Sequence, residues 1–243
     1  MIPIRQRLYI NIDHIATIRQ ARRGSEPIPL DAVSICQRAG ANGITAHLHE
    51  DRRHIQDADI EVIATNAIEF NLEMACTAEM LALAERLHPL EVTLVPETRQ
   101  EVTTEGGLDV GANASALEDA LRRLRAAGIK TSLFIDADRE SITRSRDLGA
   151  HAVELHTGPY AHAPSGGAAL EALREGARLA ASLGLAVHAG HGLTTSNVGP
   201  VAAIPEVEEL NIGHHVVARA IFVGLETAVR ELRAAMDAAR RRP

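Results

Sequence analysis

The stretch Leu8-Tyr9-Ile10-Asn11-Ile12-Asp13-His14 holds the pattern on which the whole fold is built. An apolar run with the character of a β-strand stops abruptly at polar side chains that can carry chemistry. The same change recurs at His47-Leu48-His49, His156-Thr157-Gly158 and Gly190-His191-Gly192. In a barrel of alternating strands and helices the strand ends converge on one rim, so we expect these side chains to meet there.

Short β-rich runs alternate with longer segments of helical spacing along all 243 residues. Several helical segments end at a Gly that can turn the chain back toward the sheet, as at Gly40 and Gly128. No Ser/Pro-rich linker divides the chain, so we predict one α/β domain over residues 1–243, a (β/α)8 TIM barrel. Its strands are expected at 8–12, 43–48, 70–74, 91–95, 130–135, 152–156, 186–189 and 208–212. A doubly wound open sheet is the alternative, but no Gly-x-Gly-x-x-Gly turn follows the first run.

Composition excludes several classes of protein. The net charge of −7 gives no cationic field for nucleic acid or a membrane surface, and the chain has no Trp, two Tyr and three Phe for base stacking. No apolar run approaches the roughly 20 residues that span a bilayer, and no signal peptide opens the chain, so a cytoplasmic protein is expected. Twelve His in a chain so poor in aromatics indicate an enzyme.

Two long segments with basic residues and Gly are expected to be loops on the catalytic rim that could close as lids. The first runs roughly from Asp13 to Pro29 and includes Arg22. The second follows Val95 and includes Thr103.

The segment from His47 to His54 is the densest in polar residues, and the His-x-His spacing of His47 and His49 is also typical of metal ligands. The alternative function is therefore a metal-dependent barrel hydrolase that would use His47, His49, His156 and His191. Such barrels carry the His pair on the first strand and an acid on the last, whereas the last run here ends Asn211-Ile-Gly213. We expect no metal ligand. A third possibility is a barrel that binds a phosphate ligand without turnover.

Three further features indicate acid–base chemistry on a phosphorylated substrate. Glu73 lies in an apolar run, where burial would raise the pKa of its carboxyl and suit a general acid or base. Gly190, Gly192 and Gly213 end the last two runs, whose loops commonly bind phosphate in such barrels. Lys130 is the only Lys and begins its run, so a Schiff-base lysine on the rim is excluded.

Taken together these segments resemble the pyridoxine 5′-phosphate synthase family, the ring-closing enzymes of one vitamin B6 route. The resemblance spans nearly the whole chain and rests on long strings: Asn11-Ile-Asp-His-Ile-Ala-Thr17, Glu50-Asp-Arg-Arg-His54, Asn71-Leu-Glu-Met-Ala75, Val95-Pro-Glu97, Arg99-Gln-Glu-Val-Thr-Thr-Glu-Gly-Gly-Leu-Asp109, Phe134-Ile-Asp136, His156-Thr-Gly158, Ala189-Gly-His-Gly-Leu193 and Glu209-Leu-Asn-Ile-Gly-His214.

The resemblance implies a TIM barrel that condenses 1-deoxy-D-xylulose 5-phosphate with 3-amino-2-oxopropyl phosphate, without metal or organic cofactor, as a homo-octamer. It implies His47 and Glu73 as proton acceptors and His191 as a proton donor. It assigns the amino-ketone phosphate to Asn11, Arg22, Gly192, Gly213 and His214. It assigns the deoxyxylulose phosphate to Asp13, His14, His54 and Thr103, with His49 beside them.

The chain departs from the family at His49, where the family usually has Arg. Arg is always charged and can bind phosphate through two parallel hydrogen bonds, whereas His is charged only part of the time near neutral pH. We therefore predict that the deoxyxylulose phosphate binds more weakly than in a His49→Arg variant, and increasingly so as pH rises. The check is KM for this substrate against pH in both proteins. A KM that neither pH nor the substitution moves would contradict the prediction.

Overall fold

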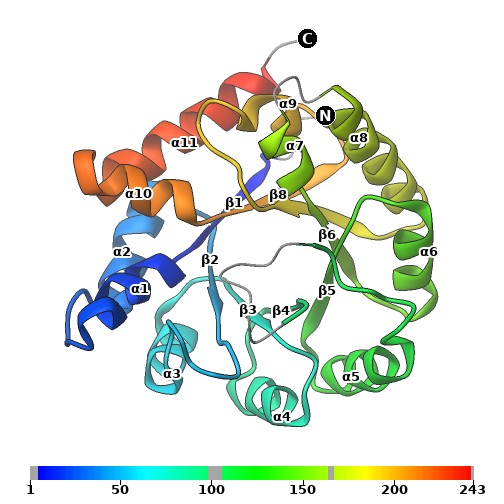
Figure 1. Ribbon diagram of the computed structural model, residues 1–243, viewed down its shortest axis with the longest axis horizontal. Coiled ribbons are helices and arrows are strands. Elements are labelled where there is room, and N and C mark those ends of the chain that lie inside the picture. The colour runs from blue at the N-terminus through cyan, green and yellow to red at the C-terminus, as the bar shows by residue number, and fades with distance from the viewer. Residues whose placement is uncertain (1–4, 98–105, 164–166, 242–243) are drawn as a thin grey trace.

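A computed structural model describes residues 5–97, 106–163 and 167–241. Within them, parallel strands pair in chain order and the last pairs with the first, which closes a barrel (Figure 1). The strands are β1 (Arg7–Asn11), β2 (Gly43–His47), β3 (Phe70–Met74), β4 (Glu91–Leu94), β5 (Lys130–Ile135), β6 (Ala152–His156), β7 (Ala186–Gly190) and β8 (Val207–Ile212). The predicted (β/α)8 barrel is confirmed, and every predicted strand agrees with an observed one to within one residue at each end.

Helices surround the barrel and cover its outer face (Figure 1). They are α1 (Asp13–Arg22), α2 (Pro29–Ala39), α3 (Asp57–Asn66), α4 (Ala78–Leu87), α5 (Ala114–Ala126), α6 (Arg139–Asp147), α7 (Gly158–His162), α8 (Gly167–Ser182), α9 (Val198–Ala202), α10 (His214–Val223) and α11 (Leu225–Arg240). The turn from α2 into β2 uses Gly40 at φ +108° and the turn from α5 into β5 uses Gly128 at φ +77°. Side chains other than Gly rarely adopt these angles.

The first predicted loop is wrong, because most of the segment from Asp13 to Pro29 forms α1. The side chain of Asn11 starts this helix by accepting a hydrogen bond of 2.9 Å from the backbone N–H of Asp13. Arg19 does not face solvent but donates to both carboxylate oxygens of Asp59 on α3, at 2.7 and 2.6 Å. Arg19 and Arg22, for which we predicted a loop, thus belong to a helix that a buried ion pair joins to α3.

Below the rim, the barrel interior carries a layer of ionisable side chains. Glu154, His188 and Glu209 are neighbours in the strand register of β6, β7 and β8, and each is buried. The Nδ1 of His188 lies 3.3 Å from Glu91 Oε1 and 3.6 Å from Glu209 Oε1. Desolvation lowers the pKa of His188, but the charges of Glu209 and Glu91 outweigh it and raise the pKa to about 9. A cationic His188 therefore compensates the buried acids beneath the rim.

Candidate active site

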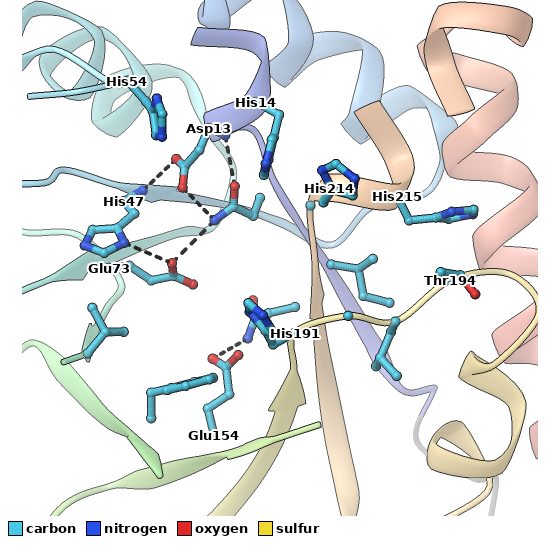
Figure 2. Close-up of a pocket in the computed structure, with 18 of the residues that line it drawn as sticks. Asp13, His14, His47, His54, Glu73, Glu154, His191, Thr194, His214 and His215 are labelled. Carbon is cyan, nitrogen blue, oxygen red and sulfur yellow. Dashed lines mark hydrogen bonds and ion pairs between the residues drawn. The ribbon is translucent and has the colours of Figure 1, made fainter. Parts of the chain in front are cut away.

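A cavity of about 470 Å³ opens at the carboxyl ends of the strands. The structure brings nearly all of the residues predicted from the sequence to this one cavity (Figure 2), with side chains arriving from several different strand ends. The predicted residues that line it are Asn11, Asp13, His14, His47, His49, His54, Glu73, His191, Gly192, Gly213 and His214.

Two predicted residues are not placed at the cavity. Arg22 is exposed in the last turn of α1 and does not line the cavity. At about 1.5 Å of rise per residue, the helix carries it roughly 13 Å along its axis from Asp13. Thr103 lies outside the described residues.

Asp13, His47 and Glu73 form a hydrogen-bonded group on one side of the cavity (Figure 2). Asp13 Oδ1 accepts a hydrogen bond of 2.8 Å from the backbone N–H of His47. The amide of Asn11 joins the two carboxylates, since its Nδ2 donates to Asp13 Oδ2 at 2.9 Å and to Glu73 Oε2 at 3.4 Å. His47 and Glu73 are register partners on β2 and β3, and His47 Nδ1 lies 3.9 Å from Glu73 Oε2.

Burial sets the protonation of this group. Desolvation, followed by the charges of Glu154 and Asp13, raises the pKa of Glu73 well above its ordinary value. Desolvation also lowers the pKa of His47, and the charge of His49 lowers it further. A carboxyl and an imidazole whose pKa values are shifted toward each other can exchange protons with a substrate near neutral pH.

Glu154 was not selected from the sequence, yet it lines the cavity from β6. Its Oε2 accepts a hydrogen bond of 2.9 Å from Asn211 Nδ2 (Figure 2). Desolvation, only partly offset by His188, raises the pKa of Glu154 to about 8. The signal that singles out Glu73, a carboxylate inside an apolar run, is also present at Glu154 and could have found it.

His191 enters the cavity from the loop after β7 in an unusual backbone conformation, with φ +84°. A side chain other than Gly in this region indicates a conformation held by its surroundings, as is common at active sites. Desolvation, followed by the charges of His156, His162 and His214, lowers the pKa of His191 to about 4. The imidazole is therefore neutral at pH 7, and an anion beside it would favour protonation.

The opposite part of the cavity suits an anion. Gly213 precedes α10, whose first residues His214 and His215 line the cavity, and the amino terminus of a helix is a favourable place for a phosphate. The rings of His14 and His214 lie beside this point, 4.8 Å apart. Gly213 is held close to β1: a Cβ on it would lie 2.9 Å from the Cβ of Asn11. Among the described residues no Arg or Lys lines the cavity.

Glu97, which follows β4, also lies close to the catalytic group although the sequence analysis did not select it. Its Oε1 is 3.2 Å from His47 Nε2 and 2.5 Å from His49 Nδ1. Burial opposes ionisation of this carboxyl, but the two imidazoles hold its pKa below the ordinary value. Its position in the string Val95-Pro-Glu97 is the one sequence signal that points to it.

Comparison with known proteins decides the family. A family model described as pyridoxal phosphate biosynthesis protein PdxJ matches residues 8–238. The pyridoxine 5′-phosphate synthase of Synechococcus sp. (strain JA-2-3B'a(2-13)) is 55% identical over 233 residues, which cover 94% of this chain and 98% of the relative. That of Caulobacter sp. (strain K31) is 53% identical over 244 residues, covering 96% and 97%. The chain belongs to this family.

Membership of the pyridoxine 5′-phosphate synthase family confirms the resemblance found in the sequence and identifies the chain as an enzyme of pyridoxine biosynthesis. The solved structures that resemble this chain have low sequence identity to it and therefore support only the fold. A 4-hydroxy-2-oxoglutarate aldolase superimposes with a TM-score of 0.66 at 14% identity, covering 97% of this chain and 99% of that one. A 3-hexulose-6-phosphate synthase superimposes with a TM-score of 0.63 at 15% identity, covering 94% and 99%.

The alternative of a metal-dependent hydrolase is not supported, because the synthase relatives match almost the full chain. Nor does the cavity assemble its four proposed ligands. Within the described residues, the groups spaced to hold a metal ion are His47, His49 and Glu97, and Asp13, His47 and Glu73. His156 instead places its Nδ1 3.1 Å from Asp136 Oδ1.

A search of the described residues for helices that could span a membrane finds none of sufficient length and hydrophobicity.

Proposed function

We propose that this synthase condenses 1-deoxy-D-xylulose 5-phosphate with 3-amino-2-oxopropyl phosphate to pyridoxine 5′-phosphate, inorganic phosphate and water, in the cytoplasm and without metal or organic cofactor. The observation that carries the proposal is one cavity with two halves. One half holds Glu73, whose pKa burial raises, and His47, whose pKa burial lowers so that the imidazole is a neutral base, and the other holds His191 beside the amino terminus of α10.

The chemistry requires protons to be moved in several stages. Imine formation between the substrate amine and the ketone, loss of water, and ring closure each remove a proton from one atom and deliver one to another. His47 and Glu73 serve as acceptors, because a neutral imidazole and a carboxyl of raised pKa can both take up and release a proton at neutral pH. His191 serves as donor once a bound phosphate has favoured its protonated form.

The substrates are assigned to the two halves of the cavity. Gly192, Gly213, His214 and Asn11 would bind the amino-ketone phosphate, since the helix terminus and the glycines admit an anion close to the backbone. His14, His49, His54 and Asp13 would bind the deoxyxylulose phosphate. Arg22 and Thr103 complete the assigned set, and for Arg22 this requires α1 or its end to approach the cavity when substrate binds.

The test is turnover of the purified protein with both substrates in the presence of a chelator. Pyridoxine 5′-phosphate is followed by mass spectrometry and phosphate release is measured in the same sample. Equimolar formation of both is the expected result. Ligand binding without product from folded protein would support a non-catalytic barrel, and activity that the chelator abolishes would contradict a reaction free of metal.

Binding of a phosphorylated substrate is expected to take up protons at pH 7. Desolvation lowers the pKa values of His14, His54 and His191, so these imidazoles are neutral in the free enzyme. A phosphate dianion beside them raises those pKa values and draws protons from solution. Isothermal titration calorimetry in buffers of different ionisation enthalpy measures this uptake. An enthalpy of binding that does not depend on the buffer would contradict it.

We also propose the homo-octamer that family resemblance implies. Ile221 and Phe222, at the end of α10, support association between copies of the chain, because they are 68% and 82% exposed. Exposed apolar side chains of this size are usual at protein interfaces. Light scattering should give an octamer for the wild type and smaller species for Phe222→Glu, with Ile68→Glu, equally exposed on the loop before β3, as the control. A monomeric wild type would overturn the proposal.

A further inference from the structure

His47, His49 and Glu97 point three potential metal-ligand atoms at one another on the wall of the cavity. Glu97 Oε1 lies 3.2 Å from His47 Nε2 and 2.5 Å from His49 Nδ1. The two imidazole rings are stacked, with centroids 3.7 Å apart and planes inclined by 27°. All three ligand atoms lie within 4.8 Å of one another.

The three atoms are also buried without a conventional hydrogen bond. The side chains of His47, His49 and Glu97 are 5%, 12% and 7% exposed, and none of the three facing atoms has a hydrogen-bond partner of acceptable geometry. Buried polar atoms are normally paired, because an unpaired one costs about 1–3 kcal/mol. Three such atoms converging on one point suit a cation that can accept electron pairs from all of them.

The surroundings orient these side chains as the outer partners of metal ligands do. Glu97 Oε2 accepts a hydrogen bond of 3.2 Å from the backbone N–H of Glu50, which leaves Oε1 directed at the imidazoles. His47 Nδ1, the ring nitrogen that does not face Glu97, lies 3.9 Å from Glu73 Oε2. Outer carboxylates and backbone groups fix ligating His and Glu residues in this way.

From this convergence we propose that His47, His49 and Glu97 form a binding site for one divalent transition-metal ion of the Zn²⁺ class. Two imidazole nitrogens and one carboxylate oxygen suit Zn²⁺, Co²⁺ or Ni²⁺ and do not suit Mg²⁺ or Ca²⁺, which prefer oxygen ligands. Tetrahedral coordination with bonds of about 2.1 Å separates ligand atoms by roughly 3.4 Å. The His47–Glu97 distance already agrees, and His49 must move back by about 1 Å.

Occupation of this site inhibits the synthase. The metal coordinates Nε2 of His47, the residue proposed as a proton acceptor, and its charge lowers the basicity of this imidazole and of Glu97. This consequence rests on the proposed function, whereas metal binding itself does not. The site differs from that of a metal-dependent hydrolase, because His156 and His191 take no part and the ion blocks turnover.

The experiment titrates chelator-treated protein with Zn²⁺ by calorimetry and with Co²⁺ by visible absorption, in the wild type, His49→Arg and Glu97→Gln. Arg has no lone pair to donate, so His49→Arg removes one ligand. Loss of an outer partner alone weakens metal binding 10–100-fold, so each variant is expected to bind at least about tenfold more weakly. His88→Asn, at the exposed end of α4, is the control and should bind as the wild type. Circular dichroism confirms the fold of each variant.

The expected result is one equivalent of Zn²⁺ per wild-type chain, with tetrahedral Co²⁺ bands that both variants lose. Absence of binding, or equal affinity in all proteins, would overturn the site. Turnover is then measured against free Zn²⁺, and half-inhibition should occur at the Kd from calorimetry. If Zn²⁺ binds but leaves turnover unchanged, the inhibitory role is wrong. If Zn²⁺ binds and the metal-free enzyme makes no product, the proposed function fails and the site stands.

Discussion

The Glu73→Gln variant is expected to lose about 10²–10⁴-fold in kcat while it becomes more stable than the wild type. Gln keeps the size of the side chain and an oxygen that can accept from Asn11 Nδ2, but it can neither take up nor release a proton. The loss of rate measures the proton transfers made by Glu73. The gain in stability arises because a carboxyl that resists ionisation is removed from a buried position near Glu154 and Asp13.

The gain has a defined dependence on pH. Burial raises the pKa of Glu73 in the folded state, so below the ordinary value of 4.5 the carboxyl is protonated in both states and adds no penalty. As pH rises above that value, the unfolded chain ionises first, and the wild type loses stability until the folded carboxyl also ionises. The difference in the free energy of unfolding between Glu73→Gln and the wild type should therefore grow as the pH rises above 4.5, until the folded carboxyl also ionises.

Urea denaturation at several pH values measures this difference, and steady-state kinetics measures the rate. Glu61→Gln is the matched control, since Glu61 is an exposed carboxylate on α3 outside the cavity. It should leave kcat unchanged and stability within about 0.5 kcal/mol. Full activity of Glu73→Gln would remove this residue from the mechanism. A stability difference that does not vary with pH would refute the raised pKa.

The second large effect is expected at His191, where two variants separate backbone strain from chemistry. His191→Ala and His191→Gly both remove the imidazole, so each should lower kcat by about 10²–10⁴-fold. Their stabilities should differ, because the φ of +84° is strained for Ala and relaxed for Gly. After the larger chain entropy of unfolded Gly is subtracted, we expect His191→Gly to be more stable than His191→Ala by about 1 kcal/mol.

Thermal or urea unfolding of the two variants provides the comparison, with kcat measured on the same preparations. Equal stability, or a more stable Ala variant, would mean that the loop after β7 relaxes once the imidazole is gone and that the conformation is not imposed by the surroundings. Retention of activity in either variant would show that another group supplies the proton.

Strand positions could be predicted almost to the residue, because a strand and the Gly that precedes it are local features. The run from Phe70 to Met74 and the turn at Gly128 depend on side chains a few positions apart. The convergence of His47, Glu73 and His191 could also be predicted, since the ends of barrel strands share one rim. The strand positions could be predicted because the residues that set them are close in the sequence. The convergence of the three side chains could be predicted from one rule of barrel topology.

Other features depend on groups that are distant in sequence. The segment beginning at Asp13 is a helix, which the ion pair of Arg19 with Asp59 joins to α3, whereas the sequence alone suggested a loop. The exposed position of Arg22, outside the cavity lining, follows from that helix.

The amino-acid sequence by itself determined the barrel, the family and most of the cavity residues, because periodicity, turn residues and long motifs involve residues that are close together in the sequence. Only the tertiary structure decided the protonation of Glu154 and His191 and the contact of Glu97 with His47 and His49. The reason is that desolvation and Coulomb energy depend on distance and burial in space, and a few ångströms between residues on different strands set both.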